Sequence, residues 1–291
     1  MSFVLFTDSC SNLPTQVVKE LDIHLLPCAY SVGGQEVFYS GDLDQFDSHA
    51  YYDKLRAGEL VSTSLLNMQL FLDLFQPVLE AGQDIVYVGM SSGISGTYHA
   101  STLAAQELAE QYPDRVIRTV DSHSAGIGVG ILACKGADLR SEGKTADEAA
   151  DILEDINLLE YFTVDDLKHL HRTGRLSAAG AVIGSVLNIK PLLRGDEAGH
   201  IVTCGKFRGR KKAVSEIIAR YAAEHDPEKL DRVAISHGDC PEEAEELARQ
   251  VREVSNPREL YIVPHEPFTG AHVGPGMLAV YFFGKGPNPK A

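Results

Sequence analysis

Cysteine is scarce in this chain of 291 residues, and its distribution excludes two ways of organising a fold. The five cysteines are odd in number and widely separated, and none belongs to a C-x-x-C pair. Disulfide frameworks and structural zinc sites need paired, closely spaced cysteines. We therefore expect a reduced protein that depends on a hydrophobic core, and its 44% of hydrophobic residues is ordinary for a globular chain.

Positive charge is scarce as well. The 26 Lys and Arg residues face 41 Asp and Glu residues, which gives a formal net charge of −15. Nucleic acids and anionic membranes require a positive protein surface, so this surplus argues against both as partners. Residues 161–220 are the exception, because they carry 11 basic against 5 acidic residues.

This basic segment contains two groups of cationic side chains. Arg172 and Arg175 belong to the first group, and Arg208, Lys211 and Lys212 belong to the second. Arginine makes directional contacts with carboxylates and phosphates, so the segment predicts a docking surface for an acidic partner or a phosphate group. A solvated face that keeps the protein soluble would have the same composition.

Long apolar runs are missing too. The chain begins with a short apolar stretch that leads directly into polar residues 7–9, without the charged region of a signal peptide. The longest weakly polar stretch, residues 178–189, is too short to span a bilayer and contains Asn188. We therefore expect a soluble, cytoplasmic protein.

Short apolar stretches alternate with amphipathic ones along the whole chain, which is typical of parallel β-α-β units in an α/β fold. The expected strands are 3–6, 24–30, 35–40, 85–88, 116–120, 161–164, 201–206, 233–236, 260–263 and 278–283. The expected helices are 14–21, 48–56, 68–80, 95–111, 125–140, 146–157, 178–187, 211–224 and 242–254.

The length and the shift of charge near residue 160 predict two α/β domains. The first domain, residues 1–160, should contain a mainly parallel sheet. The second domain, residues 161–291, should contain a mixed sheet with flanking helices, and a ligand would lie between the two domains.

The most informative segment is residues 84–98, where an apolar strand leads through a turn rich in glycine and serine into a helix. Unpaired N–H groups at the start of a helix favour an anion, and Ser91, Ser92 and Ser95 add hydroxyl donors. Gly93 would let a ligand approach the backbone. The segment predicts a site for an anion or a carboxylate, and the alternative is a turn whose serines only cap the helix.

Residues 89–93 also match the G-x-S-x-G elbow of α/β-hydrolases, with Ser91 as the nucleophile. Either Asp231 or Asp239, followed by His265 or His272, would complete a Ser-Asp-His order. However, no glycine-rich oxyanion motif precedes the elbow, and short patterns of small residues recur by chance. A serine hydrolase is therefore the alternative to a binding protein.

Three further polar clusters, at residues 7–9, 62–64 and 121–124, follow apolar stretches and precede helices. Each could be a helix cap, but together they predict a shared crevice at the carboxyl ends of the strands. The G-x-G-x-x-A pattern at 128–133 lies inside an expected helix, where it favours close helix packing over a nicotinamide site.

His272 lies between glycines, which permit an unusual backbone and the close approach of a ligand. A structural role is the alternative for this histidine. The histidines and carboxylates of the chain show no convincing metal-ligand spacing, so we expect no metal site.

Taken together, these motifs resemble those of the DegV family of bacterial fatty-acid-binding proteins, over essentially the whole chain. The matching motifs, in chain order, are FTDS at 6–9, TS at 63–64, SSGISGTY at 91–98, DS at 121–122, VDDL at 164–167, TGRLS at 173–177, LNIKP at 187–191, Arg208 with Lys211 and Lys212, and AHVGPG at 271–276. The family usually has Gln-Pro after Thr-Ser, whereas this chain has Leu65 and Leu66.

The resemblance implies a carrier that holds one long-chain fatty acid between two α/β domains, without catalysis and without a cofactor. It implies that Thr63, Ser64 and the turn with Ser91, Ser92, Gly93 and Ser95 hold the carboxyl group, with His272 and Arg175 in the surrounding polar network. It further implies that the carrier presents this group to a separate fatty acid kinase and returns acyl-phosphate for phospholipid synthesis. The kinase would dock on Arg172, Arg208, Lys211 and Lys212.

Overall fold

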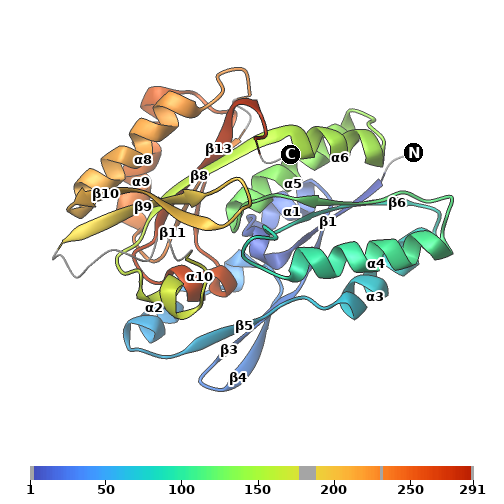
Figure 1. Cartoon of the computed structure of the whole chain (residues 1–291), viewed down its shortest axis with the longest axis horizontal. Coiled ribbons are helices and arrows are strands. Elements are labelled where there is room, and N and C mark those ends of the chain that lie inside the picture. The colour runs from blue at the N-terminus through green and yellow to red at the C-terminus, as the bar shows by residue number, and fades with distance from the viewer. Residues whose placement is uncertain (1–2, 177–187, 230–231, 290–291) are drawn as a thin grey trace.

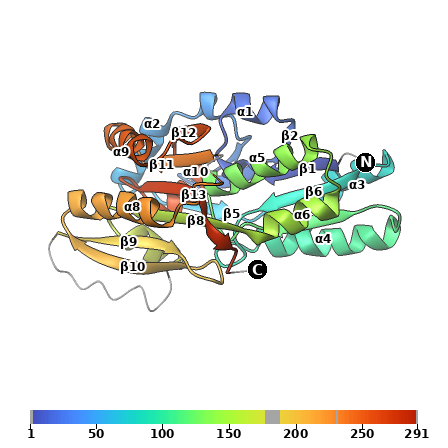
Figure 2. The ribbon, with the colours of Figure 1, turned by 90° about the horizontal axis from the view of Figure 1, so that it is seen from above.

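The computed structural model describes residues 3–176, 188–229 and 232–289 and arranges them around three β-sheets (Figures 1 and 2). The first sheet has the order β2-β1-β6-β7, the second has the order β10-β9-β8-β13-β11-β12, and the third has the order β4-β3-β5. Within the described residues, no helix combines the length and the apolar character that crossing a membrane requires.

The first sheet is entirely parallel. Its strands are β1 (Phe3–Asp8), β2 (Ile23–Leu26), β6 (Asp84–Gly89) and β7 (Ile117–Asp121). The helices around it are α1 (Thr15–Glu20), α3 (Met68–Glu80), α4 (Thr97–Gln111), α5 (Ile127–Ser141) and α6 (Ala146–Asp155). Figure 1 shows α3 and α4 on one face and α5 and α6 on the other. Every residue of β1 is buried, as expected of a parallel strand that helices cover on both sides.

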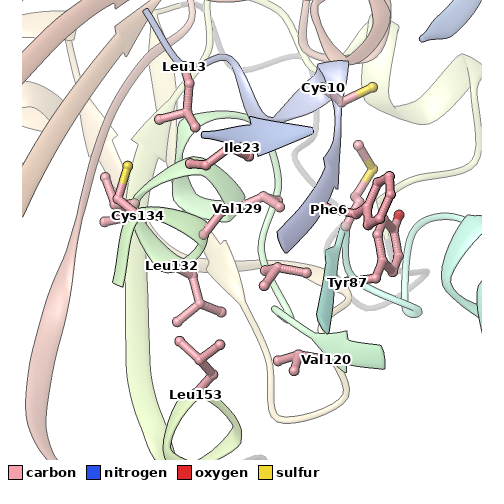
Figure 3. Packing of buried hydrophobic residues seen from close by; sticks show 14 of the residues in the cluster. Phe6, Cys10, Leu13, Ile23, Tyr87, Val120, Val129, Leu132, Cys134 and Leu153 are labelled. Atoms are coloured by element: carbon pink, nitrogen blue, oxygen red, sulfur yellow. The ribbon is translucent and has the colours of Figure 1, made fainter. Parts of the chain in front are cut away.

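Helix α5 packs closely against this sheet, and Figure 3 shows its Val129 and Leu132 within the hydrophobic core. Glycine makes the close approach possible. A Cβ atom at Gly130 would lie 2.4 Å from the backbone oxygen of Ser11, and one at Gly128 would lie 2.2 Å from the Oγ of Ser124. The G-x-G-x-x-A pattern therefore serves helix packing in this fold.

The second sheet is mixed. Its strands are β8 (Ile156–Thr163), β9 (Ile189–Gly195), β10 (Ile201–Arg208), β11 (Arg232–His237), β12 (Glu259–Pro264) and β13 (Leu278–Pro287). β13 runs antiparallel to both β8 and β11, whereas β11 and β12 are parallel. Helices α8 (Arg210–Glu224) and α9 (Pro241–Val254) bury one face of the sheet, and α5 packs near the opposite face.

The third sheet is antiparallel and lies below the other two in Figure 1. It consists of β3 (Cys28–Val32), β4 (Gln35–Tyr39) and β5 (Val61–Ser64). Helices α2 (Ser48–Arg56) and α10 (Pro267–Val273) share a small hydrophobic cluster with it. The remaining elements are the short helix α7 (Lys168–Arg172) and the 3₁₀ turns η1 (Ser9–Ser11) and η2 (Leu43–Gln45).

The α/β class, the parallel sheet and the mixed sheet are confirmed. The single strand predicted over 24–30 is wrong, because the chain leaves the first sheet at Pro27, which has no N–H group to continue a ladder, and enters the third sheet at β3. The sequence did not predict β5, β9, α7 or α10, and the helix predicted over 178–187 lies outside the described residues. The domain boundary predicted between residues 160 and 161 stays a prediction, and it falls inside β8.

Candidate functional site

A cavity of about 390 Å³ lies where β5, the turn that precedes α4, α10 and the inner face of the second sheet meet. This volume is within the usual range for sites that bind small molecules. Its lining contains both polar and apolar side chains. Among the lining residues are Thr63, Leu65, Ser92, Ser95, Ser124, Glu160, Phe162, Arg175, His265, Phe268, Thr269, His272, Met277 and Tyr281.

Thr63 and His272 meet at one side of the cavity, although they are 209 residues apart in the chain. The Thr63 Oγ1 lies 3.0 Å from the His272 Nε2. Side chains alternate along β5, so Thr63 lines the cavity while its neighbour Ser64 is exposed and does not line it. His272 lies in the last turn of α10, whose start is capped by the buried Glu266.

Burial, reinforced by the nearby charges of Arg175 and Arg172, lowers the pKa of His272 to about 3. The imidazole is therefore neutral at pH 7, and its Nδ1 has no hydrogen-bond partner among the described residues. A neutral ring can donate one hydrogen bond and accept another, but it supplies no charge.

Arg175 supplies that charge. Its guanidinium lines the cavity and donates to the backbone oxygen of Thr173 at 2.5 Å. Within the described part of the chain, no carboxylate lies within ion-pair distance of it. An arginine carries five N–H donors, so this side chain can take a carboxylate from a ligand.

The turn before α4 contributes two serines to the cavity, Ser92 and Ser95. The Ser95 Oγ accepts the backbone N–H of Thr97 at 3.2 Å and donates to the Thr97 Oγ1 at 3.1 Å. The backbone N–H of Ser92 donates to the carboxylate of Asp121 at 3.2 Å. Ser95 thus accepts an N–H from the first turn of α4 and lines the cavity as well, so the carboxylate site predicted at this turn stays a prediction.

Ser91 and Gly93, in contrast, do not line the cavity. The Ser91 Oγ donates to the backbone oxygen of Gly199 at 2.9 Å and accepts the N–H of Gly93 at 3.1 Å. A Cβ at Gly93 would lie 2.5 Å from the backbone oxygen of Ala198. These residues hold the turn against the loop between β9 and β10, so the geometry does not support a direct contact between them and a carboxylate.

Within the described residues, the alternative hydrolase triad is not assembled. The hydrogen-bond partners of the Ser91 hydroxyl are Gly199 and Gly93, and no histidine is among them. The two ring nitrogens of His265 lie 2.7 Å from the Ser236 Oγ and 2.7 Å from the Thr269 Oγ1, and Asp239 pairs with Arg56 and His49. Asp231, the other candidate acid, lies outside the described residues.

Two clusters elsewhere have the residue types of a metal site. Asp8, Cys10 and Cys28 are buried together, and burial raises the pKa of the Asp8 carboxyl to about 6 and that of the Cys10 thiol well above its usual range. This environment favours neutral groups over a cation's ligands. In the exposed cluster of His49, Asp53 and Asp239, the side chain of Arg56 already provides the positive charge.

The four side chains predicted to form a docking surface, Arg172, Arg208, Lys211 and Lys212, are all exposed. Lys212 pairs with Glu216 at 2.7 Å, whereas the other three form no ion pair with any described residue. Their neighbours Lys190 and Arg210 both contact Asp165, at 2.8 Å and 3.3 Å, and thus help to fix the fold.

The sequence did not predict most of the apolar lining or three of its polar residues. Phe162, Phe268 and Met277 line the cavity, and so do Glu160, Thr269 and Tyr281. Side chains alternate along β8, which places Glu160 and Phe162 on the same face of the sheet. Only the packing of the strands and helices around β8 shows that this face borders the cavity. Leu65, which replaces the usual glutamine of the resembled family, also lines the cavity and makes its wall more apolar.

Comparisons with known proteins show the family and the fold of this chain. The family model that matches this chain is described as "Uncharacterised protein, DegV family", and it matches residues 2–285. The chain is 38% identical to a DegV domain-containing protein of Clostridium perfringens, over 99% of both chains. Its fold is similar to that of a DegV family protein from Thermus thermophilus described by its fatty acid binding (TM-score 0.85, 26% identity, 98% of this chain and 100% of the other). It is also similar to DegV from Bacillus subtilis, described as a fatty acid binding protein (TM-score 0.83, 29% identity, 98% and 100%).

Proposed function

This chain belongs to the DegV family, and on that premise we propose that it binds one long-chain fatty acid in the cavity beside β5 and α10. The fatty acid binding described for the relatives from Thermus thermophilus and Bacillus subtilis supports the proposal. The protein then acts as a carrier and not as an enzyme, since the serine of its apparent elbow donates its hydrogen bond to a backbone oxygen.

The observation that carries the proposal is the set of donors around Arg175. A carboxylate that leaves water must regain its hydrogen bonds, or its pKa rises and the neutral acid forms. Arg175 offers a charge that no carboxylate of the described residues neutralises, and Thr63, Ser95 and neutral His272 offer hydrogen bonds within the same cavity.

The acyl chain would lie along the apolar lining. Leu65, Phe162, Phe268 and Met277 surround the interior of the cavity with hydrocarbon. Each buried CH₂ group contributes about 0.8 kcal/mol, so an acid of about sixteen carbons can be held tightly without a covalent bond. Retention of a free, non-covalently bound acid is thus the expected property of this site.

The pair Thr63 and Ser64 provides the first test, because the two neighbours differ in which side of β5 they occupy. We expect Thr63→Ala to weaken the binding of palmitate to the delipidated protein by roughly tenfold or more, since a hydrogen bond to a charged group is lost. Ser64→Ala should leave the affinity within about twofold. Isothermal titration calorimetry measures both, and mass spectrometry of the protein as purified identifies the acid that it retains.

Two results would contradict the proposal. If the delipidated protein binds no long-chain acid, the cavity is not a fatty acid site. If Thr63→Ala and Ser64→Ala bind palmitate with equal affinity, the carboxyl group lies elsewhere in the cavity.

A fatty acid kinase is the partner that we propose for this carrier. Phosphorylation of the carboxyl group by such a kinase would yield acyl-phosphate for phospholipid synthesis, in the cytoplasm. Arg172, Arg208 and Lys211 support this role, because they are exposed cations without ion-pair partners among the described residues of an otherwise acidic protein. Arg172 is also close enough to the site for its charge to affect His272.

A further inference from the structure

The cavity has a second set of polar side chains, on the wall formed by the second sheet. Tyr281 of β13 and Glu160 of β8 are cross-strand partners, so their side chains lie side by side on the same face of the sheet. Ser124, His265 and Thr269 line the cavity as well. Nothing in the binding of an unsubstituted acyl chain requires such a polar wall.

Most of these polar atoms are already satisfied within the protein. Glu160 accepts hydrogen bonds from the Oγ of Ser124 and, at 3.1 Å, from the backbone N–H of Gly195. Both nitrogens of His265 have partners at 2.7 Å, one of which is the hydroxyl of Thr269. These contacts hold the wall in place and leave little freedom for rearrangement.

The hydroxyl of Tyr281 is the exception. The side chain is only 4% exposed and lines the cavity, yet its oxygen has no hydrogen-bond partner among the described residues. Since the residue lines the cavity, a ligand or a water can supply the partner that this hydroxyl needs, whereas phenylalanine would need none.

Burial also keeps this hydroxyl protonated, because it raises the pKa of Tyr281 well above the usual value. The group can therefore both donate and accept a hydrogen bond. The two polar sets are joined by α10, with Thr269 near its start and His272 in its last turn. A ligand bound through its carboxylate at Arg175 and His272 would extend its chain past the wall that contains Tyr281.

We infer that Tyr281 belongs to a second polar subsite, which selects long-chain fatty acids that carry a hydroxyl or keto oxygen on the chain. The inference rests on the proposed function, since it assumes that the carboxyl group lies at the Thr63 side of the cavity. An oxygen on the chain would satisfy the Tyr281 hydroxyl beside the carboxylate of Glu160. An unsubstituted chain would leave the Tyr281 hydroxyl facing hydrocarbon.

The test compares acids of equal length with the delipidated protein, using calorimetry. Palmitate is paired with 3-hydroxypalmitate, and stearate with 10-hydroxystearate, 12-hydroxystearate and 12-ketostearate, so that substituents near to and far from the carboxyl group are covered. We expect at least one substituted acid to bind about tenfold more tightly than its unsubstituted partner. Tyr281→Phe should reduce that ratio to near one and leave the affinity for the unsubstituted acid unchanged or slightly higher.

Tyr161→Phe is the matched control, since Tyr161 is the next residue along β8 after Glu160 and points to the opposite face, where it donates to Glu224 at 2.7 Å. This variant should keep the wild-type ratio. Equal binding within every pair, or a ratio that Tyr281→Phe does not change, would overturn the inference while the proposed function stands, and would mean that a water satisfies Tyr281. Failure of all the acids to bind would overturn both.

Discussion

At the scale of single residues, the proposed recognition of a carboxylate is divided between a neutral ring and a permanent charge. Burial keeps His272 neutral, whereas Arg175 remains charged and has no carboxylate partner among the described residues. A second buried cation at His272 would be costly without a partner of its own. The proposed site therefore has one positive charge to pair with the single negative charge of a carboxylate. The hydroxyl groups of Thr63 and Ser95 would add hydrogen bonds without adding charge.

His272 also makes the stability of the protein depend on pH. Its pKa is lowered from 6.5 to about 3 by folding, so the unfolded chain binds a proton at pH 5 that the folded protein does not bind. The stabilisation is complete above pH 6.5 and is lost as the pH falls toward 3. Between pH 7 and pH 5, we expect the wild type to lose about 2 kcal/mol more of its free energy of unfolding than His272→Gln loses, measured by urea denaturation.

His99→Gln serves as the control, because His99 is exposed on α4. The other buried histidines are present in the wild type and in both variants, so their contributions cancel in the comparison. If the wild type and His272→Gln lose stability equally on acidification, His272 is not neutral in the folded protein.

At the scale of elements, the glycines of α5 decide how near the helix lies to the first sheet and to η1. Gly130 and Gly136 both lie inside the helix, but their surroundings differ. At Gly130 the nearest atom to an added Cβ is a backbone oxygen at 2.4 Å, whereas at Gly136 the nearest is the end of the Leu5 side chain at 3.3 Å. A side chain can change its rotamer to relieve such a contact, whereas a backbone oxygen moves only if the chain around it moves.

We therefore expect Gly130→Ala to destabilise the protein by about 1–3 kcal/mol, despite the higher helix propensity of alanine. Gly136→Ala should leave the stability nearly unchanged or raise it slightly. Alanine has the same advantage in helix propensity there, and the flexible side chain of Leu5 can move to make room for the added Cβ. The midpoint of urea denaturation distinguishes the two. If both variants unfold at the same urea concentration, the contact between Gly130 and η1 does not limit the residue at this position, and η1 must shift to accommodate the added Cβ.

At the scale of the whole molecule, the charge is unevenly distributed, because residues 161–220 are basic in an otherwise acidic protein. The cations that pair with Asp165 and Glu243 are used within the fold, and Arg208 and Lys211 beside them remain available. Within the described residues, neither Arg208 nor Lys211 has an ion-pair partner. The proposed docking of an acidic partner is therefore tested at these two cations.

If a fatty acid kinase docks there, Arg208→Glu combined with Lys211→Glu should reduce acyl-phosphate formation by about tenfold or more at limiting carrier concentration, through loss of charge complementarity. Palmitate binding should be unchanged, because neither residue lines the cavity. Acyl-phosphate formed by a fatty acid kinase with ATP is the readout, alongside calorimetry with palmitate.

The single variant Arg208→Glu is compared with Arg252→Glu, which reverses the same charge. Arg252 is exposed and lies near the end of α9, whereas Glu243 lies near its start. Nine helical residues separate Arg252 from Glu243, which corresponds to about 14 Å. Equal losses of phosphorylation in both variants would indicate a general effect of charge, and a parallel loss of palmitate binding would remove the docking assignment.

Local patterns predicted much of the architecture. Apolar alternation, caps and turn residues are properties of neighbouring residues, so the helices over 48–56 and 68–80, the hairpin across 33–34 and the strand and turn of residues 84–98 all follow from short windows. For the same reason, the short strands β5 and β9 and the helix α10 were missed, since packing against distant elements stabilises them more than their own composition does.

The sequence by itself determined the α/β class, the acidic character with its basic segment, and the presence of serines at the start of α4. Only the tertiary structure decided which of these serines can meet a ligand. Ser91 contacts Gly199, 108 residues away, and so leaves the cavity to Ser92 and Ser95. Contacts between distant residues depend on how the sheets pack, and no short pattern encodes that packing. The same reason applies to Tyr281, whose unpartnered hydroxyl becomes visible only when β13 is placed beside β8.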